Sequence, residues 1–256
     1  MSNYIDLDPI KHKNVQIDKN IKLSAAEDQH LLRLRVTELG HAGTSFPLFA
    51  TKFSDGNWML VALTSFVPGS NSFVVNDEWQ ANYLPVCLQT YPLAMRENEN
   101  QELAICIDNA FIQSFEQQTN HAVETDSLFN DEGSHTLYLK QMQAILEDDV
   151  KNAYHSYHFL QYLIEKDLLN LIDIQVQYTN GEVNSIKGLQ SINEDKLQSL
   201  DAKTIVEMRD RGYLTPVYAM LLSLYQLNAL IRINNKIDGA EKIEKIGLVQ
   251  SKDLGA

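Results

Sequence analysis

Residues 71–93 read Asn71-Ser-Phe-Val-Val-Asn-Asp-Glu-Trp79-Gln-Ala-Asn-Tyr83-Leu-Pro85-Val-Cys87-Leu-Gln-Thr-Tyr91-Pro92-Leu93. This stretch holds one of the two tryptophans, two tyrosines, two of the six prolines and one of the two cysteines. Aromatic side chains bury a large area and keep a polar group, and each proline fixes φ and removes a backbone donor. The stretch is therefore predicted to form a shaped, partly buried loop bracketed by short strands.

Strand patterns surround this loop in the first half of the chain. Residues 46–53 and 58–66 are apolar runs of strand length, and Ser54-Asp55-Gly56-Asn57 between them predicts a hairpin with a short loop. Both runs show little alternation, which predicts that the hairpin is covered on both faces. Residues 103–107 are a further apolar run and predict a buried strand that ends at Asp108.

Helical patterns dominate the second half. Apolar residues recur in steps of three and four from residue 137 to 169, which predicts a long amphipathic helix, with Asp148-Asp149 as the place where it could break. Thr215-Pro216 opens a helix through about residue 233. Its apolar residues at 217–233 lie nearly all round, so this segment is either a core helix or a subunit interface. The second alternative predicts a homo-oligomer.

One hairpin interrupts these helices. Residues 172–178 alternate apolar with polar side chains and are followed by Asn180-Gly181 and a second short run. Asn-Gly supplies the two positive φ values of a type I′ turn. The whole pattern predicts an α+β fold with an antiparallel, β-rich N-terminal half and a mainly helical C-terminal half. We expect a single domain over residues 1–233 and a loosely packed, charged tail over residues 234–256.

Three shorter segments complete the predicted fold. Ser24, with Glu27 three residues later, predicts a capped helix over residues 25–34. Residues 109–125 are polar, show no clear period and are expected to be irregular. Asp201 is predicted to cap a short helix that is closed by Gly212.

The charge of the chain excludes several classes of protein. The chain has 256 residues and a formal net charge of −13, a sign that repels phosphate backbones and excludes nucleic-acid binding. Its scattered lysines form no polybasic membrane patch. No export signal is visible, and no run reaches the ~18 apolar residues that span a bilayer. We therefore expect a cytoplasmic protein that does not bind membranes.

The two cysteines, Cys87 and Cys106, lack the short repeated spacing of a metal site. We expect reduced, buried thiols, with a disulfide between them as the alternative. Cys87 could be a nucleophile only beside an activating base, and the sequence identifies none. The motifs Gly-x-Ser-x-Gly, Walker A and Gly-x-Gly-x-x-Gly are absent, and no cofactor is assigned.

Two pairs of residues are candidates for chemistry. His155 and His158 lie on neighbouring turns of the predicted long helix, a spacing that can chelate a metal. The alternative is two surface histidines beside Tyr154 and Tyr157 in the core. Asp108 follows a buried strand, and with Glu78 it could divide acid and base roles. The alternative is a strand-end aspartate that accepts hydrogen bonds from nearby backbone amides.

The loop itself supplies the candidate binding residues. Trp79, Tyr83, Pro85, Tyr91 and Pro92 could form an aromatic-proline surface for a peptide or a protein partner. The alternative is that these side chains belong to the core and leave one face exposed.

Several short pieces of the sequence occur in an order and spacing that resemble a known family. They are His12, Phe46-Pro47-Leu48-Phe49, Asn71-Ser-Phe73-Val74, Trp79, Tyr83-Leu-Pro85, Tyr91-Pro92, Cys106-Ile-Asp108, Leu128-Phe129-Asn-Asp-Glu-Gly133, Gly188-Leu, Glu194-Asp-Lys-Leu197 and Gly212-Tyr-Leu with Ala219, Leu222 and Ser223. No single piece is specific. Together they resemble the SapC family of bacterial proteins over most of the chain.

The sequence departs from the family pattern in two places. Gln89 and Thr90 stand where the family usually places two arginines, and Asn76-Asp77-Glu78 shortens the family's Asp-Gly turn before the tryptophan. If those arginines bind an anion in relatives, this chain has lost that ability or supplies it elsewhere.

The resemblance implies an association with surface-layer gene clusters, or with genes for flavin-dependent halogenase-like and cupin-like enzymes, and implies no catalytic residues. We expect a non-catalytic binding or assembly protein that contacts a protein or peptide partner through the aromatic-proline surface. The alternative is an enzyme, or an enzyme subunit, that acts on a small molecule or peptide with Asp108 and Glu78 as its acid–base pair.

Overall fold

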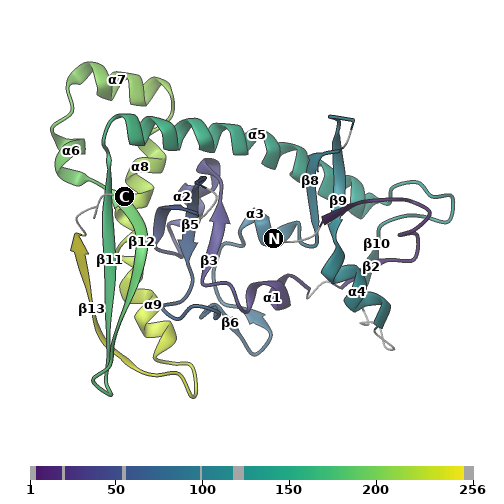
Figure 1. Cartoon of the computed structure of the whole chain (residues 1–256), viewed down its shortest axis with the longest axis horizontal. Helices are drawn as coiled ribbons and strands as arrows, with labels where there is room; N and C mark the ends of the chain where they lie inside the picture. The colour runs from purple at the N-terminus through teal and green to yellow at the C-terminus, as the bar shows by residue number, and fades with distance from the viewer. Residues whose placement is uncertain (1–3, 19–20, 54–55, 99, 118–123, 251–256) are drawn as a thin grey trace. The chain divides into compact units, whose positions relative to one another are not determined.

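The computed structural model describes residues 4–18, 21–53, 56–98, 100–117 and 124–250 of the chain (Figure 1). The fold is α+β, as predicted, with 37% helix and 29% strand. The chain divides into two compact units. The single domain expected over residues 1–233 stays a prediction. Unit 1 consists of residues 1–26 and 86–151, and unit 2 of residues 27–85 and 152–256.

Unit 1 is built on a small antiparallel sheet of order β1-β9-β8. Its strands and helices are β1 (Tyr4–Asp6), β2 (Gln16–Asp18), α1 (Ile21–Ala26), α3 (Val86–Gln89), β8 (Leu93–Glu97), β9 (Leu103–Asp108), α4 (Asn109–Gln117), β10 (Thr125–Ser127) and the first half of α5 (Leu137–Glu165). In the core of this unit, Leu93 and Ile107 of the sheet belong to one hydrophobic cluster with Phe111 of α4 and with Leu139 and Leu146 of α5.

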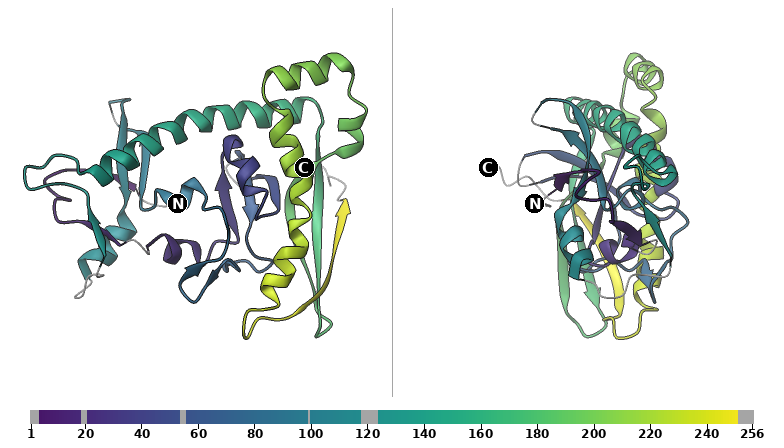
Figure 2. Two further views of the ribbon diagram at one scale, coloured as in Figure 1. Left: turned by 180° about the vertical axis from the view of Figure 1, so that it is seen from behind. Right: turned by 90° about the vertical axis from the view of Figure 1, so that its right-hand side faces the viewer.

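Unit 2 is built on a six-stranded antiparallel sheet of order β13-β11-β12-β4-β5-β3. Its elements are β3 (Leu31–Leu34), η1 (Val36–Glu38), α2 (Leu39–Ala42), β4 (Leu48–Lys52), β5 (Trp58–Leu63), β6 (Val74–Val75), β7 (Glu78–Trp79), the second half of α5, β11 (Leu169–Tyr178), β12 (Val183–Ile192), α6 (Glu194–Gln198), α7 (Ala202–Asp210), α8 (Leu214–Ser223), α9 (Gln226–Asn234) and β13 (Ile243–Gln250). Helices α8 and α9 pack on this sheet, α8 against β12 and β4 and α9 against β13 (Figure 2).

Several local predictions are confirmed. The hairpin β4–β5 pairs Leu48 with Ala62 through Lys52 with Trp58, and four of the five residues of β4 are buried, as expected for a hairpin covered on both faces. Ser54 and Asp55 of its loop lie outside the described residues. The side chain of Asp201 accepts a hydrogen bond from the backbone N–H of Thr204 at 2.7 Å and caps α7.

Two segments adopt a different structure from the prediction. The expected helix over residues 25–34 is replaced by the end of α1 and by strand β3, because Leu32 and Leu34 are buried where β3 pairs with β5. The expected irregular segment at 109–125 begins instead with helix α4, which buries Phe111 and Ile112. In both cases, packing against distant residues overrides a weak local pattern.

The long helices also differ from the prediction. Figure 1 shows α5 as one helix that continues through Asp148 and Asp149 and ends at Glu165. The helix expected from Thr215 to residue 233 is divided into α8 and α9. Ser223 donates a hydrogen bond to the carbonyl of Met220 at 2.6 Å and accepts one from the N–H of Leu48 at 2.9 Å. A serine bonded to its own helix in this way favours a bend.

The Asn-Gly hairpin is present as β11 and β12, but its turn is not of type I′. Of the two turn residues Asn180 and Gly181, only Gly181 has a positive φ, of 91°. The side chain of Asn180 instead accepts a hydrogen bond from the N–H of Glu182 at 2.9 Å. The expected loose tail at 234–256 contains β13, which pairs with β11 along residues 243–250.

Among the described residues, no single helix has both the length and the apolar composition needed to cross a bilayer. The helices α8 and α9, bent by 42° relative to each other, meet these two criteria when taken together.

Candidate functional site

The ring of Trp79 packs on two other aromatic side chains within unit 2. Its ring centroid is 6.0 Å from that of Phe46 and 6.1 Å from that of Phe73, and the rings of Phe46 and Phe73 meet edge to face at 4.7 Å. Phe46 and Phe73 are buried, whereas Trp79 is half-buried. The indole therefore packs on two buried rings while part of its surface stays exposed.

Hydrogen bonds fix the polar groups of the same loop. The indole N–H of Trp79 donates to the carbonyl of Tyr83 at 2.9 Å, and the hydroxyl of Tyr83 donates to Oε1 of Glu38 at 2.8 Å. Glu38 is only 5% exposed, and its Oε2 accepts a hydrogen bond from the N–H of Arg35 at 2.7 Å. Because these polar atoms are already paired, Trp79 and Tyr83 offer a partner mainly apolar ring surface.

A hollow adjoins this aromatic pair. The imidazole of His41 stacks on the ring of Tyr83, with centroids 6.0 Å apart and planes at 17°. His41 also lines a hollow of about 530 Å³, together with His155 and His158 of α5, Arg211, and residues at the start of α8 such as Tyr213 and Thr215. None of the described residues that line it is an aspartate or a glutamate. We call it the histidine hollow.

The predicted histidine pair therefore lies at a cavity. His155 and His158 are exposed on α5, and the ring of His158 meets those of Tyr154 and Tyr157 at centroid distances of 4.2 and 5.4 Å. The two tyrosines were expected in the core, but they are 66% and 59% exposed, because the buried face of α5 here is formed by residues such as Phe159. In the part of the chain that the structure describes, no three His, Cys, Asp or Glu side chains lie close enough together to hold a metal ion.

The other predicted binding residues are distributed between the units. Trp79, Tyr83 and Pro85 belong to unit 2, and Tyr91 and Pro92 to unit 1. Both prolines are buried, the Tyr91–Pro92 peptide bond is cis, and Tyr91 is half-buried. Of these five predicted residues, Trp79 and Tyr83 are the two partly exposed aromatic residues that belong to the same unit.

The candidate acid–base pair is also divided. Asp108 lies in unit 1, is buried, and accepts a hydrogen bond from the N–H of Ala110 at 2.9 Å at the start of α4. Glu78 is exposed in unit 2. Cys87 and Cys106 of unit 1 form no disulfide with each other; Cys106 is buried, as expected, whereas Cys87 is only half-buried. Burial raises the pKa of the Cys106 thiol.

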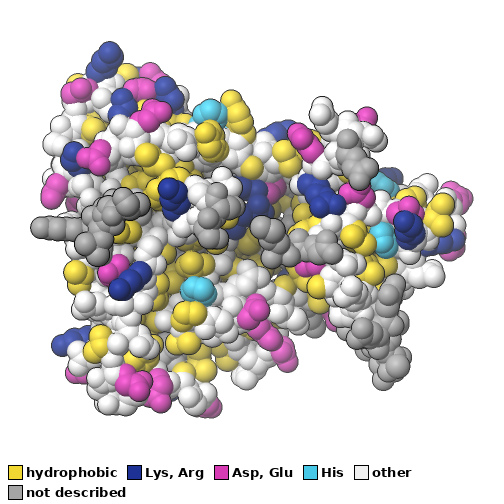
Figure 3. All heavy atoms as spheres, in the orientation of Figure 1, with side chains coloured by type: hydrophobic (Ala, Val, Ile, Leu, Met, Phe, Trp, Pro, Cys, Tyr) yellow, Lys and Arg dark blue, Asp and Glu magenta, His cyan; other side chains and the backbone are white. Residues whose placement is uncertain are grey.

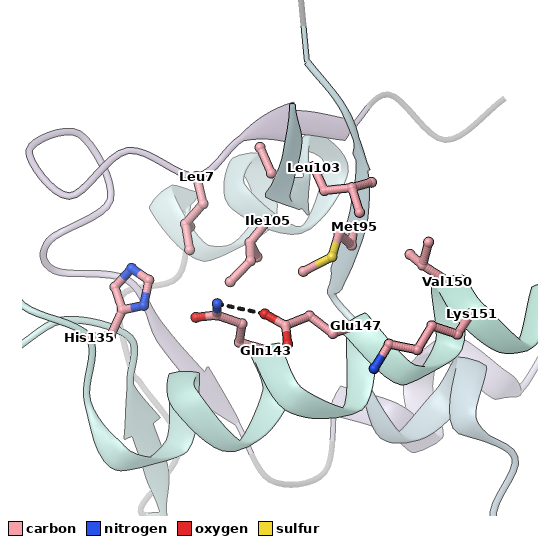
Figure 4. A pocket seen from close by; sticks show the side chains of 10 residues that line it. Leu7, Met95, Leu103, Ile105, His135, Gln143, Glu147, Val150 and Lys151 are labelled. Carbon is pink, nitrogen blue, oxygen red and sulfur yellow. Dashed lines mark hydrogen bonds between the residues drawn. The ribbon is translucent and has the colours of Figure 1, made fainter. Parts of the chain in front are cut away.

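Unit 1 has a hollow of its own, of about 510 Å³. Figure 4 shows its apolar side, formed by residues such as Met95 and Ile105 of the sheet and Leu7 just after β1. This side faces Gln143 and Glu147 of α5, which are joined by a hydrogen bond of 2.9 Å. His135 and Lys151 lie at opposite ends in this view. The Lys151 ammonium pairs with Asp148 at 3.0 Å. This hollow is mainly apolar, and its charged groups are largely paired.

A further hollow of unit 2, of about 530 Å³, involves Asn71 and Ser72 of the loop. Several of its polar side chains are engaged with one another or with the backbone. The hydroxyls of Ser65 and Ser70 lie 2.7 Å apart, and the amide of Asn234 donates to the carbonyl of Glu241 at 2.9 Å. Unlike the histidine hollow, this hollow is also lined by carboxylates, those of Glu27, Glu182 and Glu241.

Comparison with known proteins supplies the family. A family model described as SapC matches residues 7–230. The chain belongs to the SapC family. No curated protein and no solved structure matches the chain. The SapC match confirms the resemblance of the short sequence pieces, and the hydrogen bond between Ser223 and Leu48 joins two of those pieces in unit 2.

One of the short pieces on which the resemblance rests also contributes to the histidine hollow. It is Gly212-Tyr213-Leu214, and both Gly212 and Tyr213 line the hollow. His41 and Arg211 carried no sequence signal of their own. The replaced arginine positions lie elsewhere, in unit 1, where Thr90 is only 4% exposed and its hydroxyl donates to the carbonyl of Val86 at 3.1 Å.

Proposed function

We propose that this SapC protein is a binding protein without catalysis of its own, and that it holds a peptide segment of a partner protein on Trp79 and Tyr83 in unit 2. One observation carries the proposal. Both aromatic side chains are partly exposed while their polar atoms are bonded inside the protein. Rigid aromatic side chains of this kind contribute strongly to protein interfaces, because little conformational entropy is lost when a partner binds.

The geometry favours binding over acid–base catalysis. Asp108 accepts a backbone hydrogen bond at the start of a helix, which is a structural role, and Glu78 is a solvent-exposed side chain. The two belong to different units, so neither unit holds the complete pair. A general acid and a general base must both reach the reacting group, and a single carboxylate does not meet that requirement.

A peptide selection tests the proposal directly. A display library of random peptides is selected on the immobilised full-length protein, and the affinity of an enriched peptide is measured by fluorescence anisotropy. We expect Trp79→Ala to weaken binding by about tenfold or more, the loss typical of a central aromatic contact. The matched control is Tyr218→Ala, which removes an exposed aromatic side chain from α8 and is expected to leave the affinity within about twofold.

The variant must be shown to fold, because Trp79 packs on Phe46 and Phe73. Trp79→Phe keeps an aromatic ring packed on Phe46 and Phe73 and serves as a second variant. Its affinity for the peptide is expected to lie between those of the wild type and Trp79→Ala. The proposal fails if no peptide is enriched, or if folded Trp79→Ala binds the selected peptides as tightly as the wild type.

A further inference from the structure

The histidine hollow differs in charge from the rest of the chain. The sequence contains 34 acidic and 21 basic residues, yet the described residues that line the hollow include three histidines and Arg211 and no carboxylate. Tyr213 and Thr215 add hydroxyl groups. The hollow is therefore rich in hydrogen-bond donors within an acidic protein.

These donors surround a space and do not converge on one point. His41 comes from α2, and His155 and His158 come from neighbouring turns of α5. Among the described residues no such group has the geometry to hold a metal ion. A phosphate or carboxylate group has several oxygen atoms and can accept hydrogen bonds from donors on different sides.

Arg211 is held in position beside the hollow. Its guanidinium lies over the ring of Tyr162 at 5.2 Å and pairs with Glu207 at 2.8 Å. The other oxygen of Glu207 lies 3.8 Å from the ammonium of Lys166, so its negative charge is shared by two cations. A guanidinium carries five N–H donors, and the pair with Glu207 leaves others for a ligand.

We infer that the histidine hollow binds an anionic group, a phosphate or a carboxylate, that the partner peptide carries close to the apolar residue packed on Trp79 and Tyr83. This inference rests on the proposed function. His41 links the two parts of the site, because it lines the hollow and stacks on Tyr83. Figure 3 shows a histidine side chain beside hydrophobic side chains on the surface over α5. The ring centroids of Tyr154 and Tyr157 lie 4.2 and 5.4 Å from that of His158.

A titration with simple anions tests the inference without the peptide. The imidazole nitrogens of the full-length protein are followed by NMR while inorganic phosphate, and separately acetate, is added at constant ionic strength, so that screening of surface charges does not change. We expect saturable shifts at His41, His155 and His158 and none at His135, which lines the hollow of unit 1. Shifts with phosphate alone assign the group as a phosphate, and shifts with both anions extend it to carboxylates.

Two exposed substitutions complete the test. We expect His155→Gln and His158→Gln each to weaken phosphate binding by about fivefold, the loss of one charge-assisted hydrogen bond. The matched control His135→Gln is expected to have no effect. The inference is overturned if neither phosphate nor acetate shifts the three histidines of the hollow, if the anion shifts His135 as strongly as these three, or if it binds both variants as tightly as the wild type. The anion titration uses no peptide, so a failed peptide selection can be told apart from a failed anion site.

Discussion

The hollows of the two units are lined by different kinds of side chain. The hollow of unit 1 has an apolar side provided by its small sheet, and Gln143 and Glu147 opposite it are bonded to each other. The histidine hollow of unit 2 has no carboxylate among its described lining residues and adjoins a fixed aromatic pair. Helix α5 contributes to both hollows, with an amide and a carboxylate in unit 1 and with two histidines in unit 2. The binding site that we propose therefore lies in unit 2.

We expect the largest effect on stability from removing Phe46, the buried ring on which Trp79 packs. Phe46 is fully buried beneath Trp79, so Phe46→Ala leaves a cavity and lowers the free energy of unfolding by about 3–5 kcal/mol. In unit 1, Phe111→Ala is the matched change. If the units open separately, hydrogen exchange accelerates in unit 2 alone for the first variant and in unit 1 alone for the second. Faster exchange throughout the chain in both variants would instead support the single domain expected over residues 1–233.

A smaller effect is expected from the hydrogen bond that fixes Tyr83. Tyr83→Phe keeps the ring but removes the donor to the buried carboxylate of Glu38, which lowers the free energy of unfolding by about 1–3 kcal/mol. Tyr225→Phe, at a tyrosine that is 75% exposed, is the control and should leave stability unchanged. Urea denaturation measures both. Equal stability of the two variants would show that Glu38 does not depend on the Tyr83 hydroxyl.

The smallest effects concern two exposed carboxylates, one in each unit. The pKa of Asp8 in unit 1 is lowered by the backbone N–H groups of Lys11 and Ile10, and that of Asp201 in unit 2 by the backbone N–H and the side chain of Thr204. A lowered pKa in the folded state contributes stability above the unfolded-state pKa, and this contribution is lost as the pH falls through the folded-state value.

Acid titration tests this expectation in both units at once. Carboxyl carbon NMR should show Asp8 and Asp201 titrating below the ordinary range of aspartate, and Asp201→Asn should reduce the acid dependence of the melting temperature. Titration of either group at or above the ordinary value would mean that its backbone hydrogen bonds are absent in solution.

Much of the fold followed from local sequence signals, and the exceptions have identifiable causes. The hairpin at 48–63, strand β9 and the Asp201 cap depend on neighbouring residues and were predicted. Strand β3 and the division of α8 from α9 depend on distant partners. The bond between Leu48 and Ser223 joins residues 175 positions apart, and no window of sequence contains both.

The site could be predicted only in part, because some of its residues carry local sequence signals and others are brought in from distant segments. The sequence singled out Trp79 and Tyr83 by composition and His155 and His158 by helical spacing. It could not place His41 or Arg211 beside them, because these residues come from separate elements that only the folded unit 2 brings to one hollow. The aromatic loop crosses from unit 2 into unit 1 after Pro85, a division without a mark in composition.

The affinity of one selected peptide for two variants tests the central claim most directly, because each variant removes a large side chain from one unit. Trp79→Ala changes the aromatic pair of unit 2, and Met95→Ala changes the apolar side of the hollow in unit 1. We predict a loss of about tenfold or more for Trp79→Ala and a change within about twofold for Met95→Ala, measured by fluorescence anisotropy on the folded proteins. A large loss for Met95→Ala with none for Trp79→Ala would contradict the account and move the binding site to unit 1.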